Sequence, residues 1–150
     1  TCIRLTMIKG VNMKDAENYA EMIMKAEPDF IEVKGYIFVG ASRERLEMEN
    51  MPLHEDVVDF SRKLKTYLDS YDIVGEHIQS RVVLLAKKKF RIDNEWHTWI
   101  DFKKFHELAL SGKEFSTEDY LLKTPQKFIG ISGKGTLDYT KERKLTQDIQ

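Results

Sequence analysis

Residues 28–40 read PDFIEVKGYIFVG, and this stretch decides the fold. In a β-strand, side chains two positions apart lie on the same face. Ile31 and Val33 therefore point one way, and Glu32 and Lys34 point the other way. The proline before the run marks a turn out of a helix. The pattern predicts a strand with one apolar face and one charged face.

A strand and a helix are expected before this stretch. Residues 2–8 (CIRLTMI) have the composition of a buried strand, which Gly10 ends. Asn12 is placed to cap a helix over residues 13–26, with Asp15 as its capping-box partner. Apolar residues recur there at helical spacing: Met13, Ala16, Ala20, Ile23 and Met24. The two methionines are expected to fill the core. The order strand, helix, strand is the one that builds parallel sheets.

Further elements are expected downstream. They are a loop over 40–53, a helix over 54–70 with Val57, Phe60, Leu64 and Leu68 on one stripe, strands over 71–74 and 81–86, a helix over 102–111, and a short helix over 117–122 capped by Ser116 with Asp119. The loop follows the carboxyl end of the charged strand. Parallel α/β proteins place their ligands at that end of the sheet.

Composition limits the classes of function. The chain has 150 residues, of which 41% are hydrophobic and 33% charged, with a net charge of -1. Such a chain has no overall field that attracts nucleic acid, so RNA binding requires a local patch. Its one cysteine, Cys2, excludes an intrachain disulfide and a site built only from cysteines. No signal peptide or bilayer-length apolar run occurs, so we expect a cytoplasmic protein, and the opening at Thr1 indicates a piece of a longer chain.

Several motifs carry competing interpretations. The segment 130–135 (GISGKG) lacks the Lys-Ser/Thr ending of a phosphate loop. His54-Glu55 and Glu76-His77 lack the spacing of a helical zinc pair and are expected to form hydrogen bonds or caps. Glu32 and Lys34 fit a surface ion pair, a binding pair inside a barrel, or a lyase in which Lys34 forms a Schiff base.

Cations and aromatic residues alternate near residue 90. Lys87, Lys88, Lys89 and Arg91 surround Phe90, and two tryptophans follow at 96 and 99. Cations beside aromatic rings suit an RNA backbone with splayed bases. The same pattern also fits a solvated strand end with core tryptophans.

Five separated strings, in order, resemble one family. They are DFIEVKGYIFVG (29–40), ENMPLHEDVVDF (49–60), YDIVGEHIQSRVVLLA (71–86), EWHTWIDFKKFHEL (95–108) and FSTEDYLLKTP (115–125). Together they resemble the C-terminal half of the radical S-adenosylmethionine enzymes that make 4-demethylwyosine in tRNA. The resemblance spans nearly the whole chain and is weakest after Pro125.

The resemblance implies an α/β fold, the C-terminal part of a radical-SAM (β/α)6 partial barrel plus the wyosine-forming extension. It implies a carbon–carbon lyase in which a [4Fe-4S] cluster cleaves S-adenosyl-L-methionine. The resulting radical attacks N1-methylguanosine, 3′ of the anticodon of tRNA-Phe, and pyruvate supplies carbon. The cluster cysteines and the pyruvate-capturing lysine of the family lie upstream. The chain alone is therefore expected to be inactive without an N-terminal half or a companion chain, and the Schiff-base interpretation of Lys34 is weakened.

The resemblance also implies regions and site residues. Residues 1–53 would be the last barrel strands and helix, 54–130 the wyosine-forming region, and 131–150 a loosely ordered tail. The cofactor and substrate cavity would be lined by Lys9, Gly10, Asn12, Glu32 and Lys34. Candidates for tRNA phosphates are Arg43, Arg45, Arg81, Lys87, Lys89 and Arg91. An alternative function is a non-catalytic tRNA-binding module derived from the same family.

Overall fold

A computed structural model describes residues 1–123, which divide into two compact units. The first is Thr1–Lys87, and the second, Lys88–Lys127, is described as far as residue 123. The first unit contains β1 (Cys2–Met7), α1 (Ala16–Ala26), β2 (Phe30–Gly35), α2 (His54–Lys65), β3 (Tyr71–His77) and β4 (Val82–Lys87), with short 3-10 helices at Gly40–Glu44 and Met48–Asn50. The 130–135 segment and the 131–150 tail lie outside the described residues.

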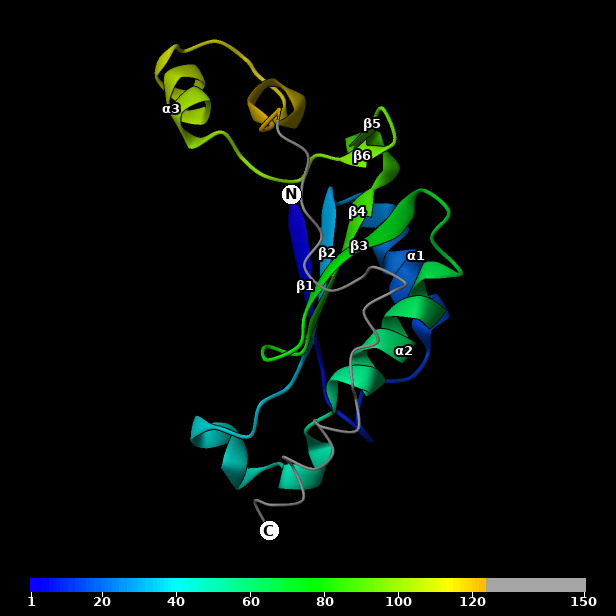
Figure 1. Cartoon of the computed structure of the whole chain (residues 1–150). Helices are drawn as coiled ribbons and strands as arrows, with labels where there is room; N and C mark the ends of the chain where they lie inside the picture. The colour runs from blue at the N-terminus through cyan, green and yellow to red at the C-terminus, as the bar shows by residue number, and fades with distance from the viewer. Residues whose placement is uncertain (124–150) are drawn as a thin grey trace. The chain divides into compact units, whose positions relative to one another are not determined.

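The sheet of the first unit has the strand order β1-β2-β4-β3 (Figure 1). β1 and β2 are parallel and joined through α1, which confirms the predicted strand–helix–strand unit. β4 is antiparallel to both β2 and β3, so the sheet is mixed and not wholly parallel. The short link over residues 78–81 accounts for the antiparallel β3–β4 pair, because a parallel connection needs a dozen or more residues.

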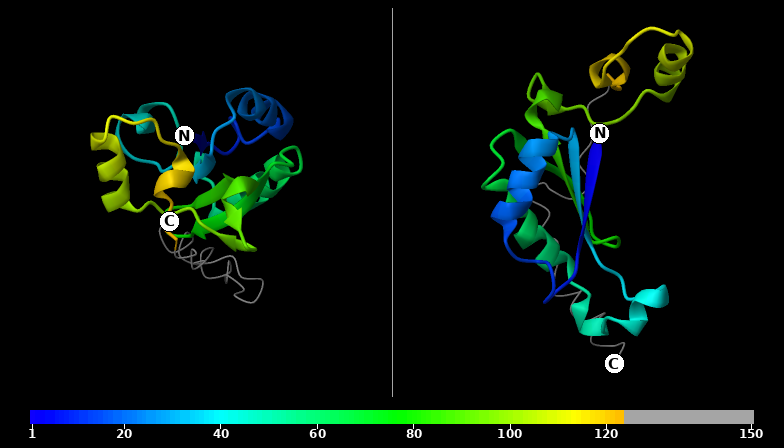
Figure 2. Two further views of the ribbon diagram at one scale, coloured as in Figure 1. Left: turned by 90° about the horizontal axis from the view of Figure 1, so that it is seen from above. Right: turned by 180° about the vertical axis from the view of Figure 1, so that it is seen from behind.

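Both helices of the first unit cover the same face of this sheet (Figure 2). Ile31 and Val33 lie on that face and are fully buried, each 0% exposed. The predicted stripe of the 54–70 segment is buried with them: Val57, Phe60 and Leu64 on α2, and Leu68 in the turn after it. Glu32 and Lys34 alternate with the buried pair and are half-buried on the opposite face. The period-2 prediction for β2 is therefore confirmed, although the strand ends at Gly35 and not at 39.

The predicted cap of the first helix was wrong. α1 begins at Ala16, and the residue before it, Asp15, has φ 54° and makes no side-chain capping bond. Asn12 cannot reach the helix because its side chain bonds the backbone at the end of β1. Met24 was also wrongly assigned to the core, since it is 52% exposed. Met13 does pack against the core, from the turn before the helix.

Two further boundaries differ from prediction. α2 ends at Lys65, after which Tyr67 and Leu68 form turn bonds to Leu64 and Lys65. β3 continues to His77 because an irregularity between Ile73 and Gly75 inserts an extra residue while keeping the strand paired. The hairpin is therefore longer than its sequence pattern indicated.

The second unit is built from short elements. β5 (Arg91–Ile92) and β6 (Glu95–Trp96) form a two-stranded ribbon. α3 (Phe102–Leu110) is capped by Asp101, whose Oδ1 accepts from Lys104 N at 3.0 Å. The predicted Ser116–Asp119 capping box is present on the 3-10 helix Thr117–Tyr120. Three aromatic rings pack edge-to-face between these elements: Phe105, Phe115 and Tyr120.

Within residues 1–123, no helix has the combined length and apolar character that crossing a bilayer requires.

Candidate functional site

The carboxyl ends of β1 and β2 are joined by polar contacts. Asn12 Oδ1 accepts from Ile8 N at 2.6 Å, and its Nδ2 donates to Thr6 O at 2.9 Å. Tyr36 N donates to Met7 O at 2.8 Å, which continues the pairing beyond the strand end. Asn12 therefore fixes the turn after β1.

Lys9 connects this turn to the start of α2. Its backbone N–H donates to Asn50 O at 2.9 Å, and Asn50 Nδ2 donates back to Lys9 O at 3.0 Å. Its ammonium lies 3.0 Å from Asp56 Oδ2, an oxygen that also accepts from Leu53 N at 2.8 Å. Gly10, with φ 75°, makes the left-handed turn that follows. The structure thus gives Lys9 a tethering role within this chain.

The five predicted cavity residues fall into three groups, of which the first is Asn12 alone, whose side chain bonds the turn after β1. Lys9 and Gly10 line a depression of about 350 Å³ on the helix side, together with Met13, Asp56, Asp59, Phe60 and Lys63. Glu32 and Lys34 lie on the opposite face of the sheet. Within residues 1–123, the five side chains therefore do not line one cavity.

The charged face of β2 carries the ion-paired Glu32 and the cation Lys34, which is unpaired within the described residues. Glu32 Oε2 accepts from Arg4 Nε at 2.8 Å across the parallel pair β1–β2. Lys34 is half-buried between its cross-strand neighbours Thr6 and Val82. Its ammonium forms no hydrogen bond or ion pair with any residue of the described chain. This cation is therefore available to an anionic ligand.

A buried histidine–carboxylate pair lies at the start of α2. His54 Nε2 is 2.8 Å from Glu76 Oε2, and their side chains are 0% and 5% exposed. Nε2 must carry the proton, because a carboxylate only accepts. The prediction that these two residues form hydrogen bonds is confirmed. Their pairing with each other, over 22 positions, had no signal in the sequence.

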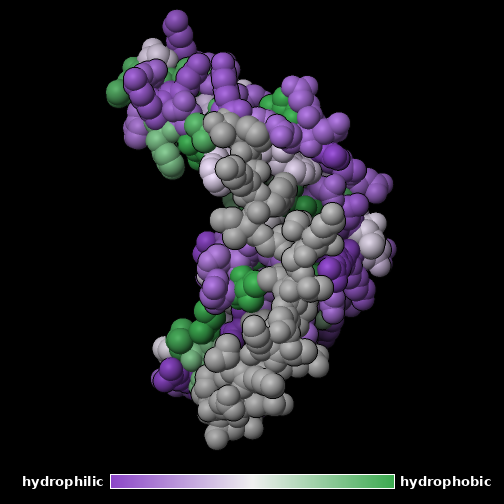
Figure 3. Space-filling view, viewed as in Figure 1, coloured by the Kyte–Doolittle hydropathy of each residue, from purple (hydrophilic) through white to green (hydrophobic). Residues whose placement is uncertain are grey.

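The predicted tRNA-binding cations are divided between the units. In the first unit, Arg43 lies 5.4 Å from the ring of Phe38, Arg81 O accepts from Gly35 N, and Lys87 Nζ donates to Glu27 O at 2.8 Å. Arg45 is exposed in the loop after β2. Exposed apolar side chains accompany Arg43 and Arg45 on the segment after β2, where Ile37, Val39 and Met48 are 40%, 56% and 50% exposed (Figure 3).

The remaining two cations belong to the second unit. Lys89 Nζ is 2.7 Å from Glu118 Oε1 and lies over the Phe90 ring. The hydrogen bond from Lys89 lowers the pKa of Glu118 from 4.5 to about 2. Arg91 is exposed. Trp96 is 8% exposed, as expected of a core tryptophan, whereas Trp99 is 47% exposed.

Residues 1–123 contain no group of three or more His, Cys, Asp or Glu side chains that could hold a metal ion. Cys2 is an exposed residue, but neighbouring atoms shield its thiol partly from water, and this raises the pKa of the thiol. One thiol cannot supply the several cysteine ligands that an iron–sulfur cluster requires.

A family model described as wyosine base formation matches residues 25–87. This segment begins at the end of α1 and ends at the last residue of β4. It therefore contains both the charged strand β2 and the β3–β4 hairpin.

Curated relatives match nearly the whole chain. S-adenosyl-L-methionine-dependent tRNA 4-demethylwyosine synthases from Oryza sativa subsp. japonica and Saccharomyces cerevisiae are 43% and 42% identical to it. Each alignment covers 96% of this chain, but only 23% of the rice protein and 19% of the yeast protein. The chain therefore spans about a fifth of the length of these relatives.

A solved structure supports the same relationship. The structure of TYW1 with a lysine-pyruvate adduct bound is 33% identical, with a TM-score of 0.53, and the match covers 63% of this chain and 29% of that one. The resemblance inferred from the five strings is thus confirmed: this chain corresponds to one part of the S-adenosyl-L-methionine-dependent tRNA 4-demethylwyosine synthases.

Proposed function

We propose that this chain supplies the substrate-binding part of a tRNA 4-demethylwyosine synthase, which uses S-adenosyl-L-methionine and pyruvate to modify tRNA-Phe. In this proposal β1 and β2 are the last strands of a radical-SAM partial barrel, and residues 54–130 are the wyosine-forming region. The iron–sulfur clusters are held by protein outside these 150 residues, because Cys2 is the one cysteine here.

One observation carries the proposal, the half-buried charged face of β2. Both helices pack on the other face, so no described helix of residues 1–87 covers Glu32 and Lys34. In an α/β barrel the helices lie outside and the uncovered strand face points inward. Lys34 would therefore bind an anionic group of substrate or cofactor, while Arg4 holds Glu32 in place at 2.8 Å.

The exposed cations give the proposed tRNA contacts. The side chains of Arg45 and Arg91 form no hydrogen bond or ion pair with the described residues and are exposed. Each cation that neutralises an RNA phosphate adds affinity that decreases with salt. We assign these two to the tRNA backbone ahead of Lys89, which is held by Glu118.

A chimeric enzyme tests the proposal. Residues 1–150 replace the matching 19% of the Saccharomyces cerevisiae enzyme, and 4-demethylwyosine is measured by mass spectrometry of tRNA nucleosides from a strain that lacks the native gene. The chimera should form the product. Lys34→Met should reduce formation by roughly 10- to 150-fold, because a hydrogen bond to a charged group contributes about 1.5–3 kcal/mol.

Lys25→Met is the matched control, since Lys25 is an exposed lysine near the end of α1. It should leave product formation unchanged. An accumulated, folded chimera that binds tRNA but makes no product would support the alternative, a non-catalytic tRNA-binding module. Equal activity of Lys34→Met and Lys25→Met would contradict the role of Lys34.

A further inference from the structure

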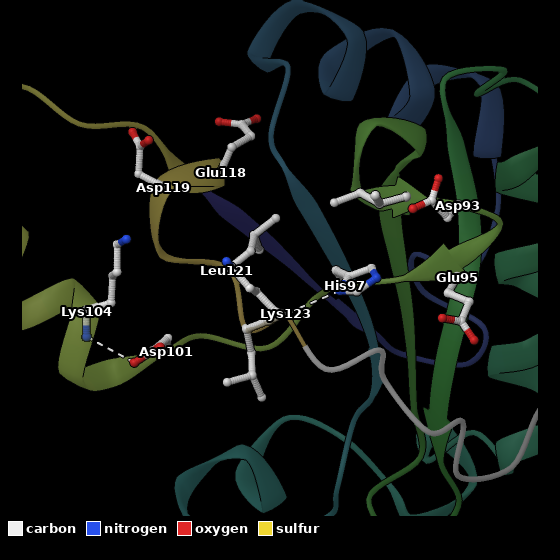
Figure 4. Close-up of a pocket in the computed structure, with 11 residues that line it drawn as sticks. Asp93, Glu95, His97, Asp101, Lys104, Glu118, Asp119, Leu121 and Lys123 are labelled. Atoms are coloured by element: carbon white, nitrogen blue, oxygen red, sulfur yellow. Dashed lines mark hydrogen bonds between the residues drawn. The ribbon is translucent and has the colours of Figure 1, made fainter.

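The second unit contains a cavity separate from the charged sheet face. It has a volume of about 640 Å³, within the range of small-ligand sites. It lies among the β5–β6 ribbon, α3 and the segment 118–123 (Figure 4). Its lining combines apolar side chains, including Leu121 and Leu122, with five carboxylates, two lysines and one imidazole.

The imidazole is that of His97, which is 9% exposed. Its Nδ1 lies 3.2 Å from Leu122 O. A carbonyl oxygen only accepts, so Nδ1 carries the proton and Nε2 of the neutral ring is an acceptor. Nε2 has no hydrogen-bond partner among the described residues. In Figure 4 it lies on the side of the ring that faces Asp93 and Glu95.

Some of the carboxylates around the cavity already have hydrogen-bond or ion-pair partners, and others have none among the described residues. Asp101 caps α3, Asp119 accepts from Ser116 N at 2.7 Å, and Glu118 is paired with Lys89. The side-chain carboxylates of Asp93 and Glu95 form no hydrogen bond or ion pair within residues 1–123. With His97 Nε2, they give the cavity three acceptors without partners in this part of the chain, and the lining also includes two lysines, Lys104 and Lys123.

We propose that this cavity binds a guanine base that is unmethylated at N1. This inference rests on the proposed tRNA function. The Watson–Crick edge of guanine presents N1–H and the 2-amino group side by side, a donor array that carboxylates and an imidazole acceptor complement. The leucines would contact the faces of the base. The five carboxylates of the lining outnumber its two lysines, which disfavours phosphate, so the site recognises a base and not the backbone.

The proposed ligand differs from the nucleotide that is modified. N1-methylguanosine has a methyl group in place of the N1 hydrogen and so lacks one of the two donors. His97 Nε2 is the buried acceptor of the set, and leaving it without its donor costs about 1–3 kcal/mol. The cavity would therefore bind a second guanosine of the same tRNA and help to fix the register of the RNA.

NMR titration of the 150-residue chain tests this site, with the imidazole resonances of His97 as the probe. Guanosine should shift them, N1-methylguanosine should bind roughly 5- to 150-fold more weakly, and adenosine should have little effect. The exposed variant Glu95→Gln should weaken guanosine binding at the His97 resonances. His97→Ala lacks this probe and should weaken binding as read from the backbone amide resonances of Leu121 and Leu122, which also line the cavity. His106→Ala is the matched control, since His106 is exposed on α3 and does not line the cavity.

Three results would overturn the inference. One is equal binding of guanosine and N1-methylguanosine. Another is saturation by spermidine with no response to guanosine, which would identify a site for organic amines. The third is an unchanged guanosine affinity in Glu95→Gln and His97→Ala. Failure of guanosine to bind while the chain still binds tRNA in a salt-dependent manner would refute this site and leave the proposed function intact.

Discussion

Removal of His54 is expected to destabilise the first unit more than any exposed substitution. His54 and Glu76 are 0% and 5% exposed and 2.8 Å apart, so water screens their interaction little. His54→Ala leaves a buried carboxylate without this donor, and breaking such a pair costs about 3–5 kcal/mol. Globular domains have a total stability of about 5–15 kcal/mol. The variant should therefore lose a large fraction of its folded population under mild denaturant.

Substitution of the partner, Glu76, should reduce the free energy of unfolding by less. Glu76→Gln keeps an acceptor oxygen near His54 Nε2 and removes the charge, so we expect a loss of about 1–2 kcal/mol. For a unit of this size, 1 kcal/mol corresponds to roughly 4–8 °C in Tm. His54→Ala should thus lower the Tm by roughly 12 °C or more, and Glu76→Gln by clearly less.

Urea unfolding of the 150-residue chain, followed by far-UV circular dichroism, measures both values. α1 and α2 supply most of the helical signal, so the transition reports on the first unit. Glu21→Ala, an exposed carboxylate on α1, is the control and should change stability by less than about 0.5 kcal/mol. A loss below about 1 kcal/mol for His54→Ala would refute the reasoning.

Two further predictions concern packing and pH. Gly35→Ala should destabilise the first unit by about 1–3 kcal/mol in the same unfolding assay, because the new Cβ would lie 3.1 Å from atoms of both Arg81 and Pro52; an unchanged midpoint would contradict this packing. Because the pKa of Glu118 is lowered to about 2 in the folded chain, its contribution to stability is complete above about pH 4.5 and is lost as the pH falls towards 2. A 13C NMR titration should give a Glu118 midpoint near 2, moved upwards in Lys89→Met; a midpoint near 4.5 in the unsubstituted chain would disprove the pairing.

Local patterns predicted those parts of the chain where one periodicity dominates. The alternation at Ile31 to Lys34 assigned each side chain to its face correctly, because a strand has only two faces. Asn12 was misassigned because an Asn side chain can cap a helix or bond a nearby turn, and the sequence does not distinguish the two. The length of the hairpin was underestimated, because a bulge interrupts alternation without ending the strand.

The sequence by itself determined the parallel β1–α1–β2 unit, the buried stripe of α2 and the relationship to tRNA 4-demethylwyosine synthases, since each follows from short-range spacing or from ordered strings of residues. Only the tertiary structure decided that β4 joins β2 antiparallel, that His54 meets Glu76, and that His97 bonds Leu122 O at the lining of a cavity. The physical reason is distance along the chain. These contacts join residues 22 or more positions apart, and packing brings them together where no local periodicity records the pairing.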